Sequence, residues 1–278
     1  MAAGYVVCVG LATRDTIMAV PSLPAPDGRV VASELATAGG GPAATAAVTL
    51  ARLGISVSFV GAVGDDDAGA AIVSELEREG IDVSELMVVP GARSPQSMIL
   101  VQPSRRAIAH YPGVASRLEL GRRAVALCRG AAWVHVDHAG YAAVPRDVRL
   151  SIDAGNPIEA LDVRGVALYA PTQTALRQQF GDPEGALRAG ADLVVVTRGE
   201  SGSAAYGRDG TFVDAPGRPV NAVSTLGAGD VFHGALLAQL VRERPLSDSL
   251  EVANECAALA CRALDARSAI PTLAEVSA

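Results

Sequence analysis

One stretch of the chain combines glycines, an acid and an apolar run in an order that suits phosphate chemistry. Residues 224–230 read STLGAGD, and the apolar run 231–241 that follows predicts a helix. Because glycine has no Cβ, backbone N–H groups can converge there, and with the positive end of the helix dipole they form an anion site. An uncompensated carboxylate beside a phosphate site is electrostatically unfavourable, and a catalytic role would explain its presence. Asp230 is therefore predicted to take a proton from a hydroxyl that attacks phosphate. The alternative is that Asp230 is a helix N-cap after a glycine-rich turn.

The pattern Thr-x-Gly-Ala-Gly-Asp before an apolar helix resembles the C-terminal signature of the ribokinase-like (PfkB) sugar kinases. The resemblance implies that Asp230 is the catalytic base, and that the anion hole for the transferred phosphate is formed by the amides of Gly227, Ala228 and Gly229. The family usually has Asp where this chain has Ser224.

Charge and composition exclude several other classes of protein. The 278 residues suit one large α/β domain or two small ones, and the net charge of −7 argues against a nucleic-acid partner. All 23 basic residues are arginines, so Schiff-base chemistry and a Walker-type phosphate loop, which both need lysine, are excluded.

The cysteines and the apolar runs predict where the protein resides. The four cysteines have no C-x-x-C spacing, which favours reduced, buried thiols: Cys8, Cys128, Cys256 and Cys261. No signal-peptide pattern is present at the N-terminus, and no apolar run reaches the ~18 residues of a membrane span. We therefore expect a cytoplasmic protein without a membrane partner.

Short apolar runs alternate with helical stretches along the chain. The clearest strand-like runs are residues 5–10, 57–61, 132–137 and 192–197. This alternation predicts an α/β fold with a mostly parallel central sheet and helices on both faces. The resemblance implies a single ribokinase-like domain over 1–278 with a small β-lid, in segments about 14–38 and 94–113. Within the second segment, 97–101 and 107–111 predict a hairpin.

Substrate contacts are expected near the N-terminal half of the sheet. Asp15 follows the first strand at its carboxyl end, where ligands bind in α/β sheets, although a lone Asp there is often a turn residue. Three glycines, 39–41, precede an Ala-rich helix. The resemblance assigns Asp15 to sugar hydroxyls and Gly40 and Gly41 to the sugar, with Ala44 where an Asn is common. Lid candidates for substrate contact are Arg29, which is otherwise a solvated side chain, Gln96 and His110.

The nucleotide side is expected in the C-terminal half. Residues 197–202 resemble the family's Thr-x-Gly-x-x-Gly loop, and 250–264 predict a helix. The resemblance implies ATP and Mg²⁺, with ATP contacts from Thr197, Gly199, Gly202, Ser224, Thr225 and Asn254. Two segments depart from the family. Thr172 and Ala175 replace the Asn and Glu that order magnesium-bound water. Asp265 and Ala269 replace the Gly and Ser of a loop that helps hold a monovalent cation, so dependence on that cation is left open.

Two groups of acids and histidines could suggest a metal held by protein side chains. The acid triplet 65–67 stands before a predicted helix, where capping and loop geometry explain it better. His135, Asp137 and His138 have a spacing that fits no closed tetrahedral site. We therefore predict no metal held by protein ligands alone.

Together these features predict an ATP-dependent sugar kinase that transfers the γ-phosphate to a primary hydroxyl of a ketohexose-like sugar. Within the family the motifs look most like those of sulfofructose kinases, which makes 6-deoxy-6-sulfofructose one candidate substrate. Arg29 can stand for one of the basic residues expected around the sulfonate, but His110 stands where an Asn is expected. The alternatives are a ribokinase, fructokinase or nucleoside kinase of the same family, or a non-catalytic sugar- or nucleotide-binding protein on this fold. Apolar lid faces predict a homodimer through the lid.

Overall fold

A computed structural model describes residues 4–102 and 105–276. Its main sheet has eight strands in the order β14-β13-β12-β11-β10-β9-β1-β4. Six run parallel: β1 (Val6–Val9), β4 (Val57–Val60), β9 (Trp133–Val136), β10 (Leu150–Ala154), β11 (Leu168–Pro171) and β12 (Leu193–Thr197). The last two pair antiparallel, as β13 (Ser203–Gly207) and β14 (Phe212–Ala215).

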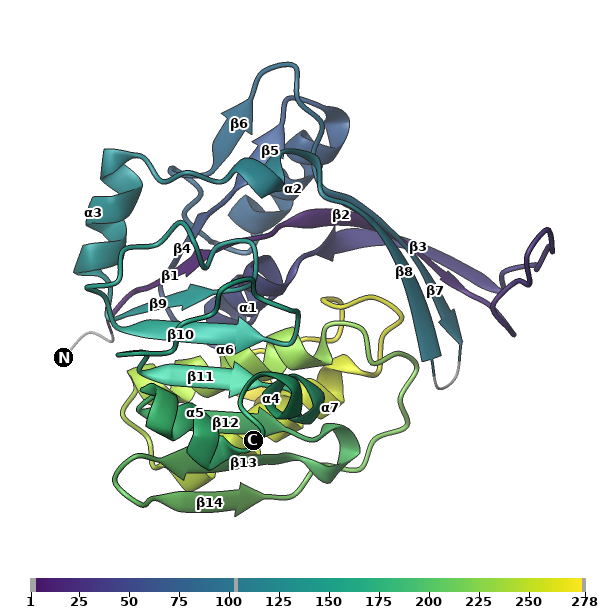
Figure 1. Ribbon diagram of the computed structural model, residues 1–278. Coiled ribbons are helices and arrows are strands. Elements are labelled where there is room, and N and C mark those ends of the chain that lie inside the picture. Colours follow the sequence, from purple (N-terminus) through teal and green to yellow (C-terminus); the bar gives the residue numbers. More distant parts are fainter. Residues whose placement is uncertain (1–3, 103–104, 277–278) are drawn as a thin grey trace.

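Helices cover both faces of this sheet, which confirms the predicted ribokinase-like α/β architecture (Figure 1). One face packs against α1 (Pro42–Arg52), α2 (Asp67–Arg78), α6 (Ala228–Val241) and α7 (Leu246–Ala260). The other packs against α3 (Arg122–Gly130), α4 (Gln173–Gln179) and α5 (Pro183–Ala189). Short elements complete the described chain: η1 (Gly113–Arg117), η2 (Gly199–Ser201) and α8 (Leu273–Val276). No helix in the described ranges has the length and apolar character needed to cross a bilayer.

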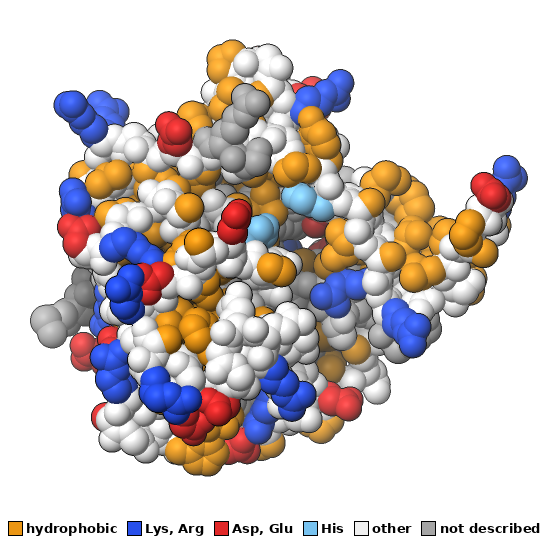
Figure 2. Space-filling view, viewed as in Figure 1, with side chains coloured by type: hydrophobic (Ala, Val, Ile, Leu, Met, Phe, Trp, Pro, Cys, Tyr) orange, Lys and Arg blue, Asp and Glu red, His pale blue; other side chains and the backbone are white. Residues whose placement is uncertain are grey.

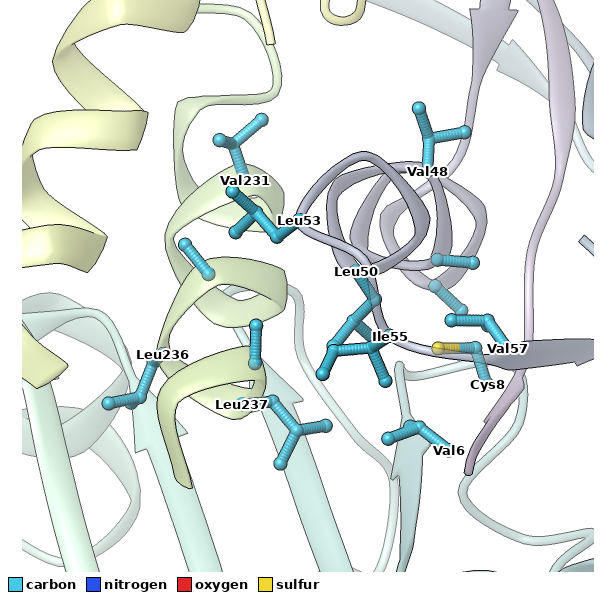
Figure 3. Close-up of a cluster of buried hydrophobic side chains, with 14 of the residues drawn as sticks. Val6, Cys8, Val48, Leu50, Leu53, Ile55, Val57, Val231, Leu236 and Leu237 are labelled. Carbon is cyan, nitrogen blue, oxygen red and sulfur yellow. The ribbon is translucent and has the colours of Figure 1, made fainter. Parts of the chain in front are cut away.

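Helix α6 is largely apolar around its circumference because its residues from Val231 to Gln239 are buried. Val231, Leu236 and Leu237 lie in the same cluster as the α1 side chains Val48 and Leu50, above the strands β1 and β4 (Figure 3). The two helices approach so closely that a Cβ on Gly234 would lie 2.6 Å from the Ala46 carbonyl oxygen. The helix that carries Asp230 is therefore fixed rigidly over the sheet.

A second sheet projects from the main body where the carboxyl ends of the parallel strands lie (Figure 1). Its order is β3-β2-β7-β8, with β2 (Thr13–Ala19), β3 (Glu34–Gly40), β7 (Gln96–Gln102) and β8 (Arg105–Tyr111). The pairing of β7 with β8 confirms the predicted hairpin. We call this sheet the lid. Its inner face packs against the main body through Ile17, Ile99 and Val101, which contact Leu226, Leu264 and Ala266. A small third sheet pairs β5 (Ala62–Gly64) with β6 (Met87–Val89).

The boundaries of the two C-terminal helices differ from expectation. Helix α6 begins at Ala228, not at residue 231, so Gly229 and Asp230 lie in its first turn. Helix α7 runs from Leu246 to Ala260 where 250–264 was predicted. Pro245 supplies the extended N-cap backbone that starts α7 early, with φ −52° and ψ 142°, and the helix ends before the loop organised by Asp265.

Candidate active site

Asp137 joins the loops at the carboxyl edge of the sheet. One of its oxygens accepts from the backbone N–H groups of Leu11 (2.8 Å) and Ala43 (3.1 Å), and the other from Ala139 (2.8 Å) and Gly140 (3.0 Å). These four donors occupy the carboxylate, so Asp137 is a structural hub. The N–H of Ala43 in the first turn of α1 is already paired here, so the glycine loop before α1 is a poor phosphate site.

The first turn of α6 differs from that of α1, because some of its N–H groups remain unpaired in the part of the chain that the structure describes. Gly227 is its N-cap, at a left-handed φ of 73°, and no side chain caps the helix. In the described residues the N–H groups of Gly229 and Asp230 have no backbone acceptor. The Cβ that Gly229 lacks would meet no atom within 4 Å. This turn can therefore accept an anion, and Asp230, two residues inside the helix, is not its N-cap.

The carboxyl group of Asp230 has unusual electrostatics for an aspartate. Burial raises its pKa to about 8, and the nearby negative charges of Asp153 and Asp137 act in the same direction. His233 and Arg106 oppose the rise. A side chain whose pKa is shifted toward neutrality, beside an anion site, has the properties of a general acid–base group.

Strand pairing in the lid brings two predicted sugar contacts together. Asp15 pairs with Ser97, and Ser97 pairs with His110, so the three lie abreast across β2, β7 and β8. The Ser97 hydroxyl lies 3.3 Å from Nδ1 of His110. Gln96 is not in this row, because successive strand residues face opposite sides of a sheet. The sequence pattern predicted the strands but not which of the two neighbours, Gln96 or Ser97, would lie in the row of Asp15 and His110.

Asp15 is buried, with 5% of its surface exposed, and burial raises its pKa although Thr13, Ser97 and Arg267 oppose the rise. Its Oδ1 atom has no hydrogen-bond partner in the described chain. A Cβ on Gly40 would lie 2.0 Å from Asp15 Oδ2, so glycine is needed there for this carboxylate to fit. Gly41, with a φ of 89°, then turns the chain into α1.

Arg267 is a buried cation behind the glycine loop that sequence reasoning missed. Its guanidinium donates to the Gly40 carbonyl oxygen (2.7 Å) and the Thr45 hydroxyl (3.2 Å). A Cβ on Gly39 would lie 2.2 Å from its Nη1 atom. The pairing joins the two ends of the chain, so no local spacing could have revealed it.

Arg29 lies in the loop between β2 and β3, at the free end of the lid (Figure 1). It is exposed and makes no hydrogen bond or ion pair within the described ranges. Another lid arginine reaches the main body instead. Arg106, on the same face as His110, donates to the Thr225 hydroxyl at 3.1 Å beside the α6 turn. Figure 2 shows the surface hollowed where the lid meets the main body.

The predicted nucleotide residues surround a separate part of the carboxyl edge. Thr197 ends β12, Gly199 begins η2, and a Cβ on Gly202 would lie 2.3 Å from the Ala215 carbonyl oxygen. Asn254 donates to the carbonyl oxygens of Ala215 (3.2 Å) and Pro216 (3.1 Å). It therefore holds the chain that leads into a cavity of about 300 Å³, lined by Arg218, Pro219, Val220, Glu255, Ala258, Leu259 and Arg262. The Ser224 hydroxyl accepts from the Leu226 N–H (3.1 Å) and shapes the turn before Gly227.

Local hydrogen bonds explain the residues that depart from the family pattern. Thr172 caps α4 by accepting from the Ala175 N–H (3.2 Å). Asp265 accepts from the N–H groups of Arg267 and Ser268, both at 2.7 Å, and so closes its own loop. In the acid triplet, Asp66 caps α2 by accepting from the Gly69 N–H (2.9 Å), which confirms the capping interpretation.

N–H groups at the start of α6 without acceptors in the described chain, an adjoining acid with a raised pKa and a lid sheet at the carboxyl edge are the features expected of a phosphotransferase for small hydroxylated molecules. The model of the pfkB family carbohydrate kinases matches residues 3–150 and 164–273. The chain therefore belongs to the PfkB family of carbohydrate kinases, as the sequence predicted.

Individual relatives support this membership. The chain is 31% identical to an ATP-dependent ribose-1-phosphate kinase of Halopiger xanaduensis, over 98% of this chain and 97% of the relative. It is 27% identical to the ribokinase of Haemophilus influenzae, over 96% and 95% of the two chains. The crystal structure of a putative ribokinase from Agrobacterium tumefaciens superposes with a TM-score of 0.86 at 27% identity, covering 99% of this chain and 96% of that one.

Proposed function

We propose that this protein transfers the γ-phosphate of ATP to a primary hydroxyl of a sugar held under the lid. The observation that carries the proposal is the first turn of α6, where backbone N–H groups without acceptors adjoin the carboxyl of Asp230. Asp230 takes the proton of the attacking hydroxyl. The amides of Gly227, Ala228 and Gly229 stabilise the charge that develops on the transferred group, and the Ala228 N–H must leave its long 3.4 Å bond to the Thr225 carbonyl oxygen to take part.

The nucleotide is assigned to the Thr197–Gly202 turn, the loop before α6 and the cavity beside α7. The triphosphate would then point toward Gly229, and Thr225 and Arg106 lie at its side. Mg²⁺ supplies charge neutralisation on the phosphates when it is bound. Thr172 and Ala175 offer no carboxylate, so we propose that the ion is held chiefly by the nucleotide. We leave dependence on a monovalent cation open, because Asp265 already closes the loop concerned.

For the acceptor we propose a sugar with an anionic substituent. Asp15 has a buried oxygen without a partner in the described chain, which suits sugar hydroxyls, and His110 lies in the same row beyond Ser97. Arg29 is the lid residue that we propose as the cation for the anionic group, and the relative from Halopiger xanaduensis is named for a sugar phosphate. A sulfonated ketohexose such as 6-deoxy-6-sulfofructose and ribose 1-phosphate are the two candidates, ahead of neutral ribose, fructose or a nucleoside.

The experiment is an ATP-consumption screen with Mg²⁺ over sugar sulfonates, sugar phosphates, neutral pentoses and hexoses, and nucleosides. We expect turnover above the ATPase background with an anionic sugar, and loss of that turnover in Asp230→Asn. Turnover with a neutral sugar alone would keep the kinase and refute the anionic acceptor. Binding of sugar and ATP without phosphate transfer to any acceptor would instead favour the non-catalytic alternative.

We further propose a homodimer through the outer face of the lid. Leu35, Met18 and Leu100 lie abreast there, with Met98 in the next row. Leu35 is 64% exposed and Met98 61% exposed. Apolar side chains gather over the lid in Figure 2 as well. A second copy of the chain is the proposed occupant, because two such faces are self-complementary about a two-fold axis.

A cytoplasmic location accords with the four unpaired, buried cysteines.

A further inference from the structure

Beneath the first two turns of α6 lies a polar cluster inside an otherwise apolar interface. It contains His135 from β9, Asp153 from β10 and His233 from α6, which are 1%, 4% and 5% exposed. Nδ1 of His233 lies 2.8 Å from Oδ2 of Asp153. His135 is paired separately, with its Nδ1 atom 3.1 Å from the Ser151 hydroxyl. The rings of the two histidines are 6.1 Å apart.

The pair formed by Asp153 and His233 adjoins the proposed base. His233 follows Asp230 by three residues on α6, so the two side chains lie on one face of the helix about one turn apart. A buried ion pair is seldom a gain over apolar side chains of the same size, because desolvation offsets the attraction between its charges. Apart from Asp230, His233 and Gln239, α6 carries only apolar side chains and glycines, so packing against the sheet does not explain why an ionisable pair stands at this point.

Resting on the proposed function, we propose that the Asp153–His233 pair is a positioning device for the catalytic base. Asp153 holds His233 as an imidazolium. That positive charge compensates Asp153 and leaves the carboxyl of Asp230 able to ionise next to the anion site. His233 touches neither substrate in this role and acts through Asp230.

The charges around the three groups agree with this geometry. Burial alone would raise the pKa of Asp153, but the nearby charge of His233 brings it below the ordinary value. Burial alone would lower the pKa of His233, but Asp153 and then Asp230 bring it above the ordinary value. The charged groups that face Asp230 are Asp153, Asp137, His233 and Arg106, with Arg267 also within electrostatic reach. His135 is different, because burial lowers its pKa to about 4 and keeps it neutral.

The test is the pH dependence of kcat/KM with the best acceptor of the screen. Without His233 the charge of Asp153 is uncompensated, so His233→Asn should move the acid limb upward by ~1 pH unit or more, a tenfold change in the ionisation equilibrium. The rate at high pH should recover to near wild type. The double variant Asp153→Asn/His233→Asn removes both charges, and its acid limb should return toward the wild-type position. His135→Asn is the matched control, since it removes a buried but neutral imidazole and should leave the limb in place.

A purely structural role would lower the plateau in His233→Asn without moving the limb, and that result would overturn the proposal. A double variant shifted as far as the single variant would overturn it too. If His233→Asn does not fold, the ring ¹⁵N signals of the wild-type protein decide. The chain has four histidines, and His233 can be assigned by removing the other three in turn. A neutral His233 at pH 7 contradicts the proposal.

Metal binding and a failure of the proposed base would give results different from these. The same three side chains offer ligand atoms within 4.8 Å of one another, so metal analysis of the purified protein is part of the test. A stoichiometric divalent ion would replace the ion pair and overturn the proposal. If Asp230→Asn keeps wild-type turnover, the proposed base itself fails. If Asp230→Asn is inactive and His233→Asn keeps the wild-type limb, only the positioning role fails.

Discussion

At the scale of single residues, the reactivity proposed for Asp230 has a cost in stability. Its pKa in the fold is about 8 against an ordinary 3.8, chiefly because of burial. The folded state therefore holds this proton up to a pH at which the unfolded chain has long released it. The contribution of Asp230 to stability is full below pH ~4 and is lost as pH rises through ~8.

We therefore expect Asp230→Asn to be less active and more stable. Turnover should fall by ~10²–10⁴-fold, the usual contribution of a general base. At pH 8–9 the variant should melt ~2–4 °C above the wild type, the shift expected for ~1 kcal/mol in a chain of this size. The advantage should vanish near pH 4. Melting curves of both proteins across this range are the measurement, and a variant that is less stable at pH 8–9 would contradict the electrostatic argument.

At the scale of elements, two glycines at the start of α6 are needed for different reasons, one for the backbone conformation and one for open space. Gly227 has a positive φ, and a Cβ there would lie 2.4 Å from Cβ of Ala266, whereas a Cβ on Gly229 would meet open space. Gly227→Ala should thus destabilise the fold by ~1–3 kcal/mol, the cost of a strained backbone position, and lower turnover as well. Gly229→Ala should keep or slightly improve stability, since Ala suits a helix better than Gly.

Gly229→Ala should nevertheless lose most of its turnover, because the new methyl group occupies the space proposed for the phosphate. Urea denaturation and steady-state kinetics of the two variants test this separation of stability from activity. Equal turnover in Gly229→Ala and the wild type would place the phosphate elsewhere.

The lid makes a second prediction at this scale. If the acceptor is anionic, Arg29→Ala should weaken it by ~1.5–3 kcal/mol, the range for a hydrogen bond to a charged group, and leave a neutral sugar nearly unaffected. Because Arg29 lies at the free end of the lid, this effect requires the loop to reach the cleft. Asp15→Ala should weaken both kinds of sugar, since it holds hydroxyls. Values of KM for both variants on a matched neutral and anionic sugar decide, and an equal effect of Arg29→Ala on the two rules out its assigned role.

At the scale of the whole molecule, the sequence predicted those features that local residue patterns determine. Alternating apolar runs and glycine signatures predicted the sheet, the helices on both faces and the strands of the lid. The sequence could not predict contacts between side chains that lie far apart along the chain. Arg267 behind Gly40, Asp153 beneath His233 and Arg106 against Thr225 each depend on tertiary packing. Asn254 shows the same limit, because its assignment to the nucleotide came from position in a motif, and only the fold shows that its amide holds Ala215 and Pro216.

The assembly is the last prediction, and it follows from the same alternation that built the lid. Strand residues facing inward bury Ile17 and Ile99 against the main body, so their neighbours Met98 and Leu35 must face outward. A dimer would cover them. The double variant Leu35→Glu/Met98→Glu should be a monomer in sedimentation velocity, because the two new carboxylates would be poorly hydrated at the centre of an apolar interface. Phe212→Glu is the matched control: this side chain is 60% exposed on β14, far along the main sheet, and its loss should leave the dimer intact. A wild-type protein that sediments as a monomer at micromolar concentration would refute the interface.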